Sequence, residues 1–148
     1  MNDKTYDLNE VAMMSGLSTR TLRNYLNQGF LKGDKTNRTW RFTVEDIEHF
    51  FAEPFVKESL RIKRTAAVFD FLADRKKKTE QTCVILDIPS SLKKGNAIAE
   101  FFCRQIENVS GIDFRYDRDG GCGRIILYGA AEGIATLMKA YYSTEFKD

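Results

Sequence analysis

The stretch between Leu17 and Arg41 is rich in cations. It contains six Lys or Arg side chains and a single acid, Asp34. The six are Arg20, Arg23, Lys32, Lys35, Arg38 and Arg41. Such an excess within a short folded segment is the electrostatic signature of a surface that binds phosphate groups. The pattern therefore predicts contact with the backbone of a nucleic acid.

The first of these cations lie on a segment with helical spacing. Over residues 19–28 the apolar side chains share one face and polar side chains occupy the other. The polar face contains Thr19, Arg20, Arg23, Asn24 and Asn27. Arg fits guanine and Asn fits adenine in the major groove, while backbone N–H groups beside Ser18 suit a phosphate. We expect this helix to bind DNA; a merely solvated helix is the alternative.

Two aromatic residues close to the cations have structural explanations. Tyr25 lies on the apolar face of the helix, so we expect its ring in the core, with a hydroxyl–phosphate contact as the alternative. Trp40, the only tryptophan, precedes Arg41 in an extended segment, so the two side chains point to opposite sides. We expect Trp40 to pack against the following helix rather than to stack on a base.

The elements that position these residues form a helix-turn-helix with a β-wing. Capping residues and glycines mark the ends of the first two helices, and a polar turn separates two short strands. The expected elements are helices over 8–14 and 19–28, strands over 30–32 and 39–42 around a turn at 33–37, and a third helix after Thr43. The short, glycine-containing link between the first two helices is typical of helix-turn-helix motifs.

The rest of the chain has a different pattern. Pro54 precedes one long helix over residues 55–78, with a broad apolar surface that suits pairing between subunits. The expected elements after it are a strand over 83–88, a helix over 92–109, strands over 113–117 and 124–128, and a helix over 130–142. This β-α-β-β-α order predicts a ferredoxin-like domain that lacks its last strand. Its first strand would be an unpaired edge, which a second subunit would cover, so we expect a homodimer.

The whole chain is therefore predicted to be α+β, in three parts. These are a winged helix-turn-helix DNA-binding domain over residues 1–53, a connecting helix over 54–79, and a domain over 80–148 for dimerisation or effector binding. The net charge of +2 conceals an asymmetry, because the excess of Lys and Arg lies in residues 1–78. The first half is thus the better candidate for binding a polyanion.

Enzymatic, metal-binding and membrane functions find little support. The three cysteines, Cys83, Cys103 and Cys122, are far apart, and His49 is the only histidine, so we expect no metal and no cofactor. No nucleophile and base stand at a spacing that suggests catalysis, so we expect no enzyme. The start of the chain is polar, and no apolar run approaches the roughly 20 residues of a membrane span. We therefore expect a cytoplasmic protein without a membrane partner.

Residues 6–52 resemble two related families of DNA-binding proteins. Gly16-Leu17-Ser18-Thr19-Arg20-Thr21-Leu22-Arg23-Asn24-Tyr25, followed by Gly29-Phe30-Leu31, is similar to the start of MerR-family transcription regulators. The wing, Arg38-Thr39-Trp40-Arg41-Phe42-Thr43, looks more like that of excisionase-type winged-helix domains. The resemblance implies that the second helix enters the major groove and that the wing grips the flanking backbone.

The resemblance also assigns roles to single residues. Arg23 and Tyr25 match the Arg and second Tyr of the family motif, and Arg41 matches the wing arginine that meets phosphate. Asn24 replaces the Tyr usual at its position, and the wing is shorter than in typical MerR proteins. The predicted DNA-binding residues are Ser18, Thr19, Arg20, Thr21, Arg23, Asn24, Tyr25, Lys32, Arg38 and Arg41.

Three functions are compatible with these observations. The first is a dimeric, sequence-specific transcription regulator of double-stranded DNA, whose C-terminal part either only dimerises or also binds a small-molecule effector. The second is an excisionase-like architectural protein that bends DNA. The third is an interaction or ligand-binding module without DNA binding, which would be favoured if the second helix were buried against the C-terminal part.

Overall fold

The N-terminal part of the chain folds into three helices and one small hairpin. The computed structural model describes residues 4–147. Its N-terminal elements are α1 (Leu8–Ser15), α2 (Thr19–Gln28), β1 (Asp34–Thr36), β2 (Thr39–Arg41) and α3 (Val44–Ala52). Asp7 and Glu10 form the predicted capping box of α1, with both hydrogen bonds at 2.8 Å. Local sequence signals thus set the helix starts correctly.

The first strand of the wing differs from its prediction. It was expected over Phe30–Lys32 but lies at Asp34–Thr36. The turn contains only Asn37 and Arg38, both in the left-handed region with φ of 52° and 65°, as in the tightest hairpin turns. The shorter turn moves the strand pair away from Phe30–Lys32, and Leu31 is 1% exposed, as part of the core. The hairpin is therefore short, and its tip carries Arg38.

The long helix α4 (Pro54–Ala73) ends earlier than the predicted residue 78. Pro54 occupies the first turn, where its missing N–H is tolerated. Beyond Ala73 the ammonium of Lys77 donates hydrogen bonds to the carbonyl oxygens of Phe71 and Asp74. Lys77 thus folds back over the end of the helix and satisfies carbonyl groups that have no partner within it.

The C-terminal part is a three-stranded antiparallel sheet with two helices, in the predicted order β-α-β-β-α. The elements are β3 (Gln81–Pro89), α5 (Leu92–Ile106), β4 (Ile112–Asp119), β5 (Cys122–Ala130) and α6 (Ala131–Tyr142). The strand order is β3-β5-β4, so β5 is central. The strands are longer and α5 is shorter than predicted. The chain is thus α+β, while the ferredoxin-like assignment stays a prediction.

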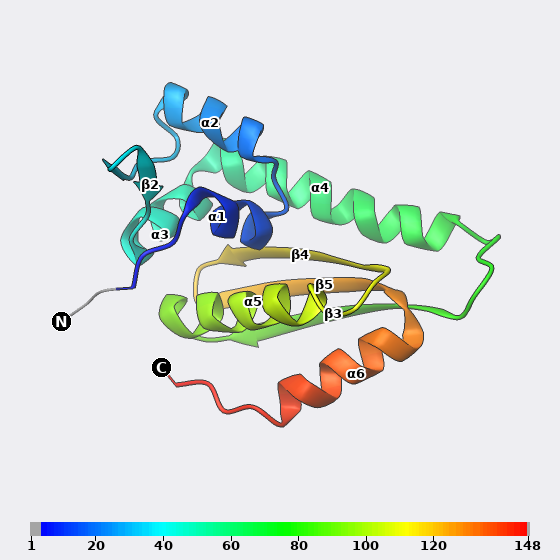
Figure 1. The fold of residues 1–148 in the computed structure, drawn as a ribbon. Coiled ribbons are helices and arrows are strands. Elements are labelled where there is room, and N and C mark those ends of the chain that lie inside the picture. Colours follow the sequence, from blue (N-terminus) through cyan, green and yellow to red (C-terminus); the bar gives the residue numbers. More distant parts are fainter. Residues whose placement is uncertain (1–3, 148) are drawn as a thin grey trace.

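Helices cover both faces of the sheet (Figure 1). On one face α5 contacts β4 and β5, and α6 contacts β5 and β3. Phe102 of α5 stacks on Phe114 of β4. On the other face Arg64 of α4 forms an ion pair with Asp117 of β4, and both side chains are largely buried. The helix α4 therefore crosses the face opposite to α5 and α6.

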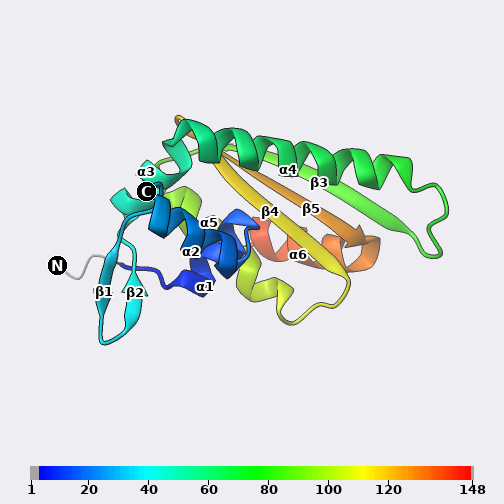
Figure 2. The ribbon, with the colours of Figure 1, turned by 90° about the horizontal axis from the view of Figure 1, so that it is seen from above.

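The helix-turn-helix part lies against the β4 edge of the sheet (Figure 2). The helix α1 contacts α5 and β4, and α3 contacts β4 and α5. Phe51 of α3 meets Tyr116 of β4 edge to face, with ring centroids 5.7 Å apart. Buried residues from Tyr6 to Leu137 form one hydrophobic cluster. The predicted division at 53/54 and 79/80 is untested, and its ends at residues 1–3 and 148 lie outside the described residues.

Candidate nucleic-acid interface

The helix α2 is held by its caps and by one buried face. Ser18 accepts a hydrogen bond from the backbone N–H of Thr21 (3.1 Å), and the hydroxyl groups of these two residues are 3.0 Å apart. Gly29 ends the helix with a φ of 83°. Leu22 is fully buried and Tyr25 is 7% exposed. The caps and this apolar face fix which side of α2 points outward.

The outward side carries the predicted polar residues. Arg20, Arg23 and Asn24 are exposed, and Thr19 is half-buried. Figure 2 shows α2 lying over α1, with no other segment covering it in that view. No ion pair involves either arginine within residues 4–147. Two free guanidinium groups and an amide therefore face solvent on one helix, which is the set of groups that can neutralise phosphate and pair with base edges.

Tyr25 occupies the core side of α2. Its ring contacts Phe30, Phe50 and Phe55, with centroids 5.9, 5.9 and 6.3 Å away. This agrees with the packing role expected for the ring, and a contact between its hydroxyl group and phosphate stays a prediction. The cluster joins α2 to α3 and to the start of α4, so it sets the orientation of the exposed face.

The β1–β2 hairpin carries Trp40 and Lys35 on one side and Arg41 on the other. Trp40 stacks on Phe42 at 6.1 Å, and the ammonium of Lys35 lies 5.6 Å from the Trp40 ring. Arg41 is exposed on the opposite side of the strand, and Arg38 is exposed at the hairpin tip. Lys32, before the hairpin, is exposed as well. The structure thus leaves Lys32, Arg38 and Arg41 accessible. The hairpin that carries the latter two lies beside α2 (Figure 1).

Sequence reasoning missed the residues that anchor the motif to the rest of the chain. Tyr6 and Phe42 exchange two backbone hydrogen bonds (2.8 and 2.9 Å), which tie the wing to the segment before α1. Lys63 of α4 donates to the carbonyl oxygen of Gly16 (3.3 Å) in the α1–α2 turn. Gly16 has a φ of 73°, and a Cβ atom there would lie 2.9 Å from Cδ of Arg115. These contacts join segments that are far apart in the chain, so no local sequence pattern predicts them.

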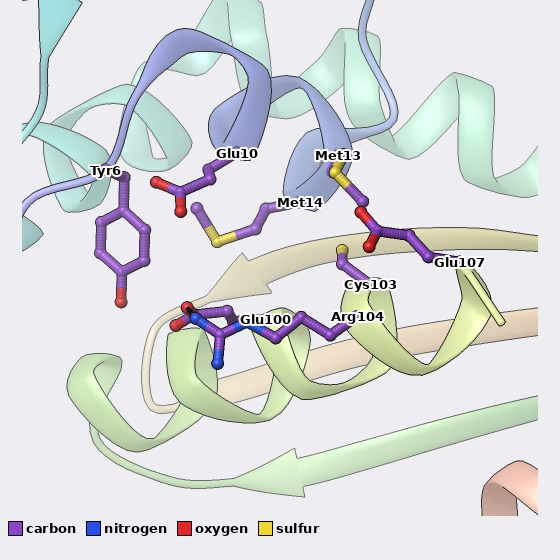
Figure 3. Close-up of a pocket in the computed structure, with 8 residues that line it drawn as sticks. All are labelled: Tyr6, Glu10, Met13, Met14, Glu100, Cys103, Arg104 and Glu107. Atoms are coloured by element: carbon purple, nitrogen blue, oxygen red, sulfur yellow. Dashed lines mark hydrogen bonds and ion pairs between the residues drawn. The ribbon is translucent and has the colours of Figure 1, made fainter.

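A small cavity of about 190 Å³ separates α1 from α5 (Figure 3). Glu100 at its floor forms ion pairs with Lys4 and Arg104. Burial raises the pKa of Tyr6 to about 12 and that of the Cys103 thiol to about 12. Cys103 is therefore a protonated thiol at neutral pH. The lining residues are Tyr6, Glu10, Met13, Met14, Glu100, Cys103, Arg104 and Glu107.

Among the described residues, no group of three or more His, Cys, Asp and Glu side chains is placed to hold a metal ion. None of the helices in the described part of the chain combines the length and the apolar character needed to cross a bilayer.

The comparison with known protein families agrees with the geometry. Residues 5–54 match the family of helix-turn-helix domains. This match spans α1, α2, the β1–β2 hairpin and α3, and every predicted DNA-binding residue lies within the matched range. No curated protein and no solved structure is similar enough to count as a match. The chain therefore contains a helix-turn-helix domain in its N-terminal third, which supports DNA as its partner.

Proposed function

We propose that this protein is a sequence-specific transcription regulator that acts by binding DNA rather than by catalysis. The observation that carries the proposal is the exposed face of α2 inside the matched domain. Arg20, Arg23 and Asn24 lie on that face, and neither arginine is engaged in an ion pair within residues 4–147. The two arginines on this capped helix thus have no acidic partner. A phosphate backbone would supply the negative charge that neutralises them.

The proposed docking places α2 in the major groove and the wing on the flanking backbone, as in winged MerR-like and excisionase-like domains. Arg23 and Asn24 then read base edges, since their side chains fit guanine and adenine. Lys32, Arg38 and Arg41 neutralise phosphates on the wing side. Base contacts would give sequence preference, and phosphate contacts would give a salt-dependent affinity.

The proposed active form is a homodimer. Four large apolar side chains of α4 are more than half exposed: Phe55 at 57%, Ile62 at 57%, Phe69 at 64% and Leu72 at 60%. In the described part of the chain β3 pairs only with β5, so its outer edge is open. Exposed apolar side chains on one helix and an open strand edge are both features that a second subunit covers. Two copies would then read two half-sites of a palindrome.

The two alternative functions are less well supported. An architectural protein needs little beyond the wing domain, whereas this chain adds a sheet and two helices. An interaction or ligand-binding module without DNA binding would be favoured if α2 were buried against the C-terminal part. The polar face of α2 is exposed instead, which favours the regulator.

Selection of genomic fragments by the purified full-length protein at physiological salt tests this proposal. We expect enrichment of fragments that share a palindromic motif. Salt-sensitive binding without a shared motif would support the architectural function instead. Absence of binding at low and at physiological salt would overturn the DNA-binding function.

A further inference from the structure

A second feature of the molecule is an open groove beside the α1–α2 turn. Its volume is about 500 Å³, within the range of roughly 300–1,000 Å³ that is common for small-molecule sites. The turn, α4, β4 and α5 all contribute to it, so both parts of the chain line it. Figure 2 shows the α1–α2 turn beside β4. The lining residues are Ala12, Met13, Gly16, Leu17, Ser18, Lys63, Cys103, Ile106, Phe114 and Arg115.

The charged residues of the groove are both cations. Lys63 is exposed, and its only hydrogen bond among the described residues is to the carbonyl oxygen of Gly16 at 3.3 Å. Arg115 is half-buried; it donates to the carbonyl oxygen of Phe114 (2.8 Å), and its guanidinium lies 5.8 Å from the Tyr128 ring. No carboxylate lines the groove, and neither cation forms an ion pair within residues 4–147. The charge that complements this groove is negative.

The walls of the groove are apolar. Met13 is 38% exposed, which is high for a large apolar side chain. Ile106 is half-buried, and the buried Phe114 also lines the groove. Apolar walls bind the hydrocarbon body of a ligand, while a few polar groups fix its orientation. The groove therefore favours a molecule with an apolar body and one anionic end.

The neighbouring cavity in Figure 3 has the opposite charge. Met13 and Cys103 line both cavities, so the two are adjacent. The cavity between α1 and α5 is lined by three acids, Glu10, Glu100 and Glu107, and by one cation, Arg104, which is paired with Glu100, so the net charge of its lining is negative and disfavours an anion. The distribution of charge thus directs an anionic ligand to the side of Lys63 and Arg115.

We propose that the groove binds a small amphipathic organic acid, an aliphatic or aromatic body with one carboxylate, sulfonate or phosphate group. The acid group contacts Lys63 and Arg115, and the body lies on Met13 and Ile106. Arg offers a planar fork of donors that matches such oxyanions, and Lys adds a flexible point charge.

Binding of a ligand in the groove would also affect α2 and its affinity for DNA. This second inference rests on the proposed function. Lys63 donates a hydrogen bond to Gly16, and Arg115 leaves no room for a side chain there, since a Cβ atom at Gly16 would lie 2.9 Å from its Cδ. The left-handed backbone of Gly16 (φ 73°) ends α1 and leads into α2. An anion that recruits Lys63 competes with its hydrogen bond to Gly16. Binding of the acid therefore alters the support of the α1–α2 turn and, with it, the affinity for DNA.

Fluorescence titration without DNA tests the site. The probe is 1-anilinonaphthalene-8-sulfonate, which is an aromatic body with one anionic group. We expect saturable binding of one probe per chain, weakened about tenfold in Lys63→Met and in Arg115→Met, because each loses one charge-assisted contact. Lys139→Met on α6 removes the same charge at a distance and should bind as the wild type does. N-phenyl-1-naphthylamine, the same body without the sulfonate, should bind at least about tenfold more weakly.

The outcomes separate the two proposals. Equal probe affinity in all four proteins, or no saturable binding by the wild type, would overturn the groove as an anion site. Circular dichroism melts check that Lys63→Met and Arg115→Met remain folded, and either variant suffices for the comparison. If the wild type binds no DNA fragment, the proposed function fails, while the probe titration still decides the groove by itself.

Discussion

Removing Arg23 tests the interface directly. Arg23 is exposed on α2 and has no ion-pair partner within residues 4–147, so Arg23→Ala should leave the melting temperature within about a degree or two of the wild type. A lost bidentate contact to a base costs about 1–3 kcal/mol. This corresponds to an affinity for the enriched fragment about 5- to 150-fold weaker. A change of base preference at one position of the site would identify the contact as base readout.

Arg41→Ala provides the comparison for a phosphate contact. Arg41 is exposed on β2, also without an ion pair among the described residues. Loss of one phosphate contact should reduce the slope of log affinity against log salt by about 0.9 and weaken all sequences alike. Fluorescence anisotropy with labelled fragments at several salt concentrations measures both effects. Lys139→Ala, with the same change of charge on α6, is the control and should behave as the wild type.

A clear result would refute this reasoning. If Arg23→Ala and Arg41→Ala both keep the affinity and the salt slope of the wild type while remaining folded, α2 and the wing do not form the interface. If Lys139→Ala loses as much affinity as they do, the effect is one of net charge and not of a defined site.

Three further predictions concern the dimer, the shared core and the response to pH. Phe69→Glu puts a charge on the exposed face of α4. Because burying a Phe side chain is worth about 1.5–3 kcal/mol, this substitution should weaken self-association at least about tenfold in sedimentation velocity. A wild-type protein that is monomeric at micromolar concentration would contradict the dimer. Phe51→Ala, at 2% exposure against Tyr116, should lower the free energy of unfolding by about 3–5 kcal/mol in one cooperative denaturant transition. Two separate transitions would show that the two parts fold independently. Burial raises the pKa of Tyr6 to about 12, so its neutral form stabilises the fold fully below pH 10, and this contribution is lost as the pH rises through 12. Tyr6→Phe should flatten the decline of the melting temperature between those pH values, and an unchanged decline would argue against this origin.

Local signals in the sequence were sufficient to predict the helices of the N-terminal part. The capping box of α1 and the glycine stop of α2 act within a few residues, and the structure confirms both. The first wing strand was misplaced because the turn depends on Asn37 and Arg38 both adopting positive φ. The sequence Asn-Arg lacks the glycine that usually marks such a turn, so its tight geometry had no clear local signal.

The exposed polar face of α2 was also predictable from local sequence, since it follows from the helical spacing of its polar residues. The groove was not predictable, because it needs Met13, Lys63 and Arg115 to meet from three elements far apart in the chain. The early end of α4 was missed as well. There Lys77 folds back onto the helix, and a run of cations is equally compatible with a continuing helix.

The position of α4 links the proposed dimer to the proposed reading of DNA. Near the N-terminus of α2, Lys63 holds Gly16; near its C-terminus, Phe55 stacks on Phe30 at 5.4 Å. One helix of 20 residues therefore contacts both ends of the segment that carries α2, and the same helix exposes Phe69 on its outer side. If two copies pair through α4, the separation of the two α2 helices is set by that pairing and not by a flexible linker. A palindrome read by adjacent major grooves needs half-sites about 34 Å apart. The dimer interface would thus decide which spacing of half-sites the protein accepts. Substitutions on the outer face of α4 would therefore change the preferred spacing of the half-sites more readily than the base preference within each half-site.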